Sequence, residues 1–115
     1  MNYRIEKINA EILRELSSLI REVKDPRLKE ADLISITKVD TTSDLCLSKV
    51  YVSVLGSEDS KKAVIKGLTS AEGFLRSGIA KALDLHATPK LTFVIDTAGE
   101  YASHIEKVIQ DIKKK

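Results

Sequence analysis

One long helical pattern, from Lys61 to Leu83, constrains the fold of this chain more than any other feature. Apolar residues recur along it at the three- and four-residue steps that share one helix face. They are Val64, Leu68, Ala71, Leu75, Ile79 and Ala82. The opposite face carries Lys62, Lys66, Thr69, Gly73 and Arg76 at the same spacing. The pattern predicts one amphipathic helix with Gly73 in its middle, on the polar face.

Gly73 is a costly residue at such a position. A glycine inside a helix lowers stability by roughly 1 kcal/mol relative to alanine. It can also kink a helix and let another backbone approach closely. Because Lys66 and Arg76 flank Gly73, we interpret the segment as a contact for a nucleic-acid phosphate backbone. The alternatives are a kink that serves packing alone and cations that are simply solvated.

Composition limits what kind of nucleic-acid surface the chain can build. Its 115 residues fit one domain, residues 1–115, and 43% hydrophobic residues provide for a core. Trp is absent and aromatic residues make up 4%, so the core must be aliphatic and a surface of stacked aromatics is not expected. The formal net charge is only +2. A basic surface therefore requires sorting of the charges onto one side.

Several site classes have no candidate residues. The single cysteine, Cys46, excludes an internal disulfide and a multi-cysteine metal site, and it fits a reducing compartment. His86 and His104 lack partners at metal-ligand spacing. No Ser/His/Asp set, P-loop or dinucleotide fingerprint occurs. No apolar run reaches membrane-spanning length. We expect a soluble cytoplasmic protein that is not an enzyme and binds no cofactor, metal or membrane.

The first helix is predicted over residues 3–24, because apolar residues recur there on one face. They are Ile5, Ile8, Ile12, Leu16, Leu19, Ile20 and Val23. The other face carries a mostly basic stripe, Arg4, Lys7, Glu11, Arg14, Ser18 and Arg21. Two interpretations of its four basic residues stay open. They contact RNA phosphates, or they pair within the helix with Glu11 and Glu15.

A charged connector, residues 24–29, follows the first helix. Pro26 is expected to end that helix, because proline disfavours helical geometry in the residue before it. Lys24 and Arg27 flank the proline in a loop, where binding residues often lie. They are candidates for RNA contact, and the alternative is an ordinary charged helix exit.

Two strands are predicted next, over Leu33–Asp40 and Leu45–Leu55. Both are rich in β-branched residues, and the turn residues Thr41–Asp44 between them favour an antiparallel hairpin. The alternation in the second strand puts Cys46 on the same face as Val50 and the other valines. Cys46 is therefore expected in the core.

A last strand and helix complete the order. A loop over residues 84–89 leads to a strand at Lys90–Ile95, and a final amphipathic helix is predicted over about 100–115. The fold class predicted is α+β, a two-layer sandwich with the helices packed on one face of a small three-stranded sheet.

This order resembles the type II KH domain, an RNA-binding fold of helix, strand, strand, helix, helix, strand. The usual Gly-x-x-Gly loop between the paired helices is replaced here by Ala71-Glu72-Gly73. In that feature the chain is similar to the ribosome-binding factor A family, whose KH-like domain has an Ala-x-Gly helix kink. Four segments in matching order carry the resemblance over nearly the whole chain: Val23–Leu28, Asp44–Val52, Ala71–Arg76 and Pro89–Asp96.

The resemblance implies a bacterial assembly factor for the small ribosomal subunit. Members bind the free subunit, help its ribosomal RNA mature at the 5′ end and support growth in the cold. It further implies that Ala71 and Gly73 belong to an RNA-binding kink. An assembly GTPase is an implied further partner, and we expect a monomer. Many members carry a polar C-terminal tail, and this sequence stops at Lys115.

Two other function classes stay open from the residues alone. A protein-interaction or small-ligand regulatory domain would bind in a pocket between sheet and helices, without salt dependence. A KH-like module for other RNAs would share the basic face, although the missing Gly-x-x-Gly loop argues against it.

Overall fold

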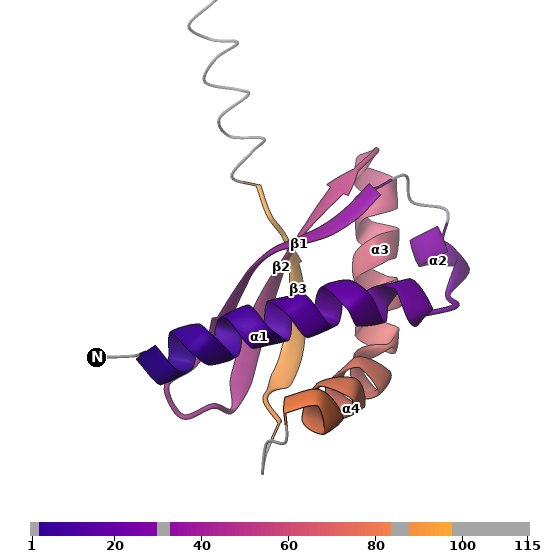
Figure 1. The fold of residues 1–115 in the computed structure, drawn as a ribbon. Coiled ribbons are helices and arrows are strands. Elements are labelled where there is room, and N and C mark those ends of the chain that lie inside the picture. The colour runs from indigo at the N-terminus through magenta and orange to yellow at the C-terminus, as the bar shows by residue number, and fades with distance from the viewer. Residues whose placement is uncertain (1–2, 30–32, 84–87, 98–115) are drawn as a thin grey trace, which may run out of the picture.

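The computed structural model describes residues 3–29, 33–83 and 88–97. The helix predicted over about 100–115 lies outside the described residues, as do His86 and His104. The elements in chain order are α1 (Tyr3–Leu19), a 3₁₀ turn η1 (Ile20–Glu22), α2 (Pro26–Lys29), β1 (Leu33–Thr41), β2 (Leu47–Leu55), α3 (Glu58–Ser70), α4 (Glu72–Leu83) and β3 (Lys90–Ile95) (Figure 1).

The three strands form one sheet in the order β1-β2-β3. β1 and β2 pair antiparallel, as the predicted hairpin requires, and β3 pairs parallel with β2. A parallel pair needs a long crossover, and here α3 and α4 supply it. The helices lie over one face of the sheet (Figure 1), which confirms the predicted α+β two-layer fold.

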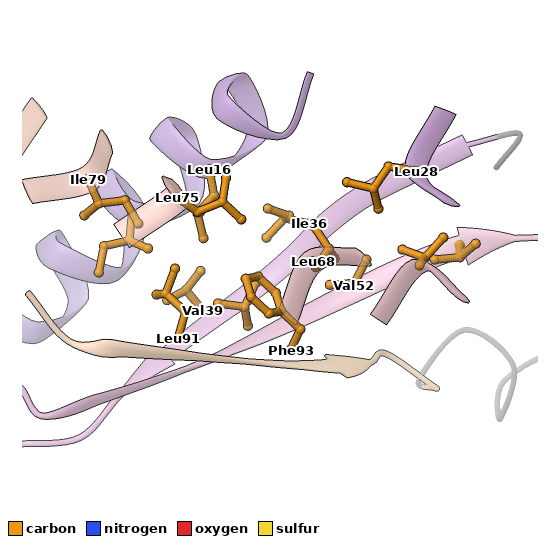
Figure 2. Packing of buried hydrophobic residues seen from close by; sticks show 14 of the residues in the cluster. Leu16, Leu28, Ile36, Val39, Val52, Leu68, Leu75, Ile79, Leu91 and Phe93 are labelled. Atoms are coloured by element: carbon orange, nitrogen blue, oxygen red, sulfur yellow. The ribbon is translucent and has the colours of Figure 1, made fainter. Parts of the chain in front are cut away.

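The core fills the space between these two layers. Figure 2 shows Leu16, Leu75 and Ile79 of the helices pointing toward the strands. All three are fully buried, as are Val50 and Val52 of β2. The buried residues form a single cluster that joins α1, α3 and α4 to all three strands. The packing is mainly aliphatic, as expected for a chain without Trp and with only 4% aromatic residues.

The first helix ends earlier than predicted. Residues 3–24 were expected to be helical, but α1 ends at Leu19, η1 at Glu22, and Val23 is extended. Pro26 then begins the one-turn helix α2 rather than lying in a plain connector, since proline is tolerated in the first turn of a helix. The side chain of Asp25 caps this turn by accepting from the Arg27 backbone N–H at 2.9 Å.

The predicted place of Cys46 in the core is wrong, because the residue is exposed. Leu45, just before it, has a positive φ of 62°, which turns the chain ahead of β2. The alternation that buries Val50 and Val52 therefore reaches back to Ser48 and not to Cys46. Strand β2 accordingly begins at Leu47, two residues after the predicted start.

Two glycines let the helices approach closely. A Cβ atom added to Gly67 of α3 would meet Leu28 of α2 at 3.2 Å. One added to Gly78 of α4 would meet Leu19 of α1 at 2.8 Å. Both positions are therefore used for packing between helices.

Candidate nucleic-acid interface

The long helix predicted from Lys61 to Leu83 is two helices that meet at Ala71. Ala71 has φ −92° and ψ 5°, which lies in the bridge region rather than the helical one. Its N–H still bonds to the carbonyls of Gly67 and Leu68, both at 3.1 Å, and its own carbonyl accepts from Leu75 N–H at 2.9 Å. One residue thus ends α3 and starts α4 without an intervening loop. The kink predicted at Gly73 therefore lies two residues earlier, at Ala71.

Gly73 lies in the first turn of α4 and has no packing role. It is exposed, and a Cβ added to it would meet nothing within 4 Å. A hollow of about 410 Å³ opens beside it, lined by Gly73, Arg76, Ser77, Ala80 and Thr88. Contacts in the described part of the chain therefore do not offset the stability that a glycine in a helix costs.

Arg76 reaches the same hollow and is held in position by Glu72. Its Nε lies 3.6 Å from a Glu72 carboxylate oxygen, and the Arg76 side chain is 43% exposed. That same oxygen accepts a hydrogen bond from Leu91 N–H of β3 at 3.1 Å. Glu72 therefore anchors α4 to the sheet and restrains Arg76 at the rim of the hollow, with part of the guanidinium free for an anion.

Lys66 does not share this hollow. It lies in α3 before the break and, with Lys62 and Ile65, lines a second groove of about 370 Å³ that also includes Ile95 and Thr97. The single polar face predicted along residues 62–76 is thus divided at Ala71. Lys66 is exposed and, among the described residues, takes part in no ion pair.

The basic stripe on α1 and η1 is exposed to solvent. Arg4, Lys7, Arg14 and Arg21 are all exposed. In the described ranges none of these four forms an ion pair, so the pairing with Glu11 or Glu15 considered above is not formed. From Arg4 to Arg21 the stripe extends about 25 Å, at 1.5 Å per helical residue.

Arg27 forms an ion pair and a hydrogen bond, whereas Lys24 forms no ion pair in the described ranges. Arg27 Nη2 lies 2.6 Å from Asp25 Oδ2 and donates to Ser70 Oγ at 3.2 Å. The hydrogen bonds from Arg27 hold the pKa of Asp25 below its ordinary value. Through Ser70, Arg27 ties α2 to the last residue of α3, directly beside the break. Lys24 is exposed and, in the part of the chain described, has no ion-pair partner.

The predicted residues therefore divide into three places. Ala71, Gly73 and Arg76 are together at the break, and Arg27 touches it through Ser70. Lys66 lies in the neighbouring groove. The other basic residues follow α1 and the segment after it: Arg4, Lys7, Arg14, Arg21 and Lys24. Phe74, next to Gly73, is half exposed and was not among the predicted residues. Helical periodicity alone could have indicated that this aromatic residue is exposed beside Gly73.

The described residues contain no group of three or more His, Cys, Asp or Glu side chains able to hold a metal ion. Nor does the described part of the chain contain a helix that is long and apolar enough to cross a membrane.

The fold and this interface define a KH-like α+β domain in which a one-residue helix break takes the place of the Gly-x-x-Gly loop. The particular family follows from sequence. The sequence model of ribosome-binding factor A matches residues 4–109, and the chain belongs to that family. The ribosome-binding factor A of Acetivibrio thermocellus is 48% identical over 109 residues, covering 94% of this chain and 87% of the relative.

Solved structures agree with this assignment. A Thermotoga maritima protein determined by NMR in solution superposes with a TM-score of 0.73 at 34% identity, over 82% of this chain and 88% of that one. A homology model of Thermus thermophilus ribosome binding factor A, fitted into the cryo-electron microscopy map of its complex with 30S, gives a TM-score of 0.64 at 26% identity. That match covers 77% of this chain and 91% of the fitted one.

Proposed function

We propose that this chain binds the free small ribosomal subunit and its ribosomal RNA as a non-catalytic assembly factor. Membership of the ribosome-binding factor A family supports the proposal, as does the 30S complex of the Thermus thermophilus relative. The observation from this chain that carries it is Gly73. Glycine destabilises a helix, yet it occupies a position where a larger side chain would meet nothing. It lies beside the hollow and beside Arg76, which Glu72 holds in position.

The chemistry of the interface suits a folded RNA backbone. A glycine without side-chain neighbours lets a phosphate approach the helix closely, and Arg76 supplies a charge-assisted contact beside it. Lys24 and the cations of α1 and η1, which form no ion pair within the described ranges, add positive charge over a long surface. Such contacts fix register and orientation and carry little sequence information. Specificity then comes from the shape of the RNA junction.

The finer functions follow the family and are part of the same proposal. Bound to an immature subunit, the factor supports maturation of the 5′ end of the ribosomal RNA and growth in the cold. We infer that it acts in the cytoplasm as a monomer and that an assembly GTPase is a further partner. Each of these steps depends on subunit binding, which is therefore the step to test.

The test is the substitution Gly73→Ala. We expect the free energy of unfolding to stay the same or rise by up to about 1 kcal/mol, because alanine favours the helix and has open space. Affinity for the small subunit should fall roughly tenfold, equivalent to about 1.4 kcal/mol, because the new methyl group holds the RNA backbone away. Urea unfolding followed by circular dichroism and equilibrium binding to purified subunits measure the two effects.

Gly78→Ala is the matched control, because it makes the same change five residues further along α4, at a position that packs against Leu19. It should lower stability through overpacking and leave the affinity of the folded protein unchanged. Full-strength binding by a well-folded Gly73→Ala variant would show that the glycine has no part in RNA contact.

A further inference from the structure

The face of the sheet opposite the helices, here called the open face, is uncovered by any of the described residues. Within the described ranges no helix packs on it, and its residues are the outward-facing ones of each strand. The pairing register sets these residues in rows across the sheet. One row joins Lys38, Tyr51 and Val94, because Tyr51 of β2 pairs with Lys38 of β1 and with Val94 of β3.

Tyr51 lies at the centre of this face with two cations beside it. Lys38 Nζ is 5.5 Å and Lys49 Nζ is 5.6 Å from the centroid of the Tyr51 ring. Tyr51 is half-buried, so part of its ring is accessible from solvent. Both distances are within the range of cation–π attraction. In the described ranges neither lysine forms an ion pair with a carboxylate.

The charge on the open face is mainly positive. The next row joins Asp40, Lys49 and Thr92, and the row after that joins Leu47 to Lys90. The outward-facing residues of the three strands in the described ranges thus include three lysines and one carboxylate. Lys90 lies about 13 Å from Tyr51 along the strand direction, at 3.3 Å per residue. A flexible polyanion could contact all three lysines.

We propose that this open face is a second RNA-binding surface, on which an unpaired base replaces a lysine ammonium group at the Tyr51 ring and stacks there, while Lys38, Lys49 and Lys90 contact the adjacent phosphates. An aromatic ring between cations on a flat sheet suits single-stranded RNA, because every base has a π-face and the backbone follows the positive charge. The low aromatic content argued against a surface of several stacked aromatics, and this surface needs only one. The helix break would bind folded RNA, and the open face of the sheet would bind single-stranded RNA.

The sheet face can be tested alone, because the chain contains no tryptophan. In the variant Tyr51→Trp, indole emission reports only this position. Titration with a short unstructured pyrimidine oligoribonucleotide should quench the emission, whereas the same strand annealed to its complement should not. Ala82→Trp places the same reporter at an exposed position of α4 that does not line the hollow, so its emission should stay unchanged. Unchanged emission of Tyr51→Trp at saturating single strand would overturn the inference, and the proposed function of the kink would stand.

Affinities of Tyr51 variants for the oligoribonucleotide separate the contribution of base stacking from that of the lysine charges. Tyr51→Phe should keep the affinity for the oligoribonucleotide, and Tyr51→Thr should lower it about 5- to 30-fold while preserving the strand, since threonine favours β structure. A Tyr51→Thr variant that binds the strand as tightly as the wild type would overturn the inference. If that same variant lost affinity for small-subunit proteins instead, the open face would be a protein-binding surface.

Discussion

We expect affinity for small-subunit RNA to fall roughly 50- to 2,000-fold when monovalent salt rises from about 50 mM to about 200 mM. The reason is counterion release from RNA phosphates. Each phosphate that a cation neutralises contributes about −0.7 to −0.9 to the slope of log affinity against log salt, and we assume about four to six such contacts. The cations available for them are exposed and unpaired in the described ranges: Arg4, Lys7, Arg14, Arg21, Lys24 and Lys66.

The measurement is equilibrium binding of labelled protein to purified small subunits at a series of salt concentrations. A variant with Arg14→Gln and Arg21→Gln should bind more weakly at every concentration, and its slope should be shallower by about 2. Both residues are exposed, so this variant should fold like the wild type. An affinity that stays flat across the series would rule out the electrostatic account and favour a partner held by apolar contacts.

The second large effect is expected from reversing the charge at the helix break. Arg76→Glu should weaken subunit binding about 10- to 100-fold, because a charged hydrogen bond to phosphate contributes about 1.5–3 kcal/mol and the new carboxylate repels RNA. Arg76→Gln should lie between this variant and the wild type. Lys66→Glu should have a smaller effect if RNA occupies the hollow beside Gly73, since Lys66 lines a different groove. Binding assays on all three variants make the comparison.

Lys81→Glu is the matched control for charge. Lys81 is an exposed cation of the same helix, and it does not line the hollow. The variant alters net charge as Arg76→Glu does, so it measures the long-range effect alone. Equal losses from Arg76→Glu and Lys81→Glu would show that Arg76 contributes charge and no specific contact. Thermal unfolding of each variant checks that the fold keeps its stability, because Glu72, the ion-pair partner of Arg76, also bonds to Leu91 of β3.

The sequence predicted the elements well where one periodic pattern extends over many residues. The stripe of α1, the hairpin and β3 are in the expected places, because each buries one face against the same core. The break at Ala71 was harder to place. Residues on both sides of it favour helix, and what positions the two halves is close packing of Gly67 on Leu28 and Gly78 on Leu19. Those contacts join segments far apart in the chain.

The candidate site was predicted in part for the same reason. Local spacing identified the exposed cations of α1, Gly73 and Arg76, but it could not show that Arg27 is held by Asp25 and by Ser70, which lies 43 residues away. Nor could it show that the break separates Lys66 from Gly73. Tyr51 was missed because cross-strand register, not sequence distance, brings Lys38 beside it.

One measurement tests subunit binding most directly, namely sedimentation of a cell extract on a density gradient while following a tagged copy of the protein. Run at low salt, the protein should migrate with free small subunits and be absent from full ribosomes. The co-migration should be lost at high salt and reduced in the Arg76→Glu variant. Migration only at the top of the gradient at low salt would contradict the account, and the interface at the helix break would then have to serve a different partner.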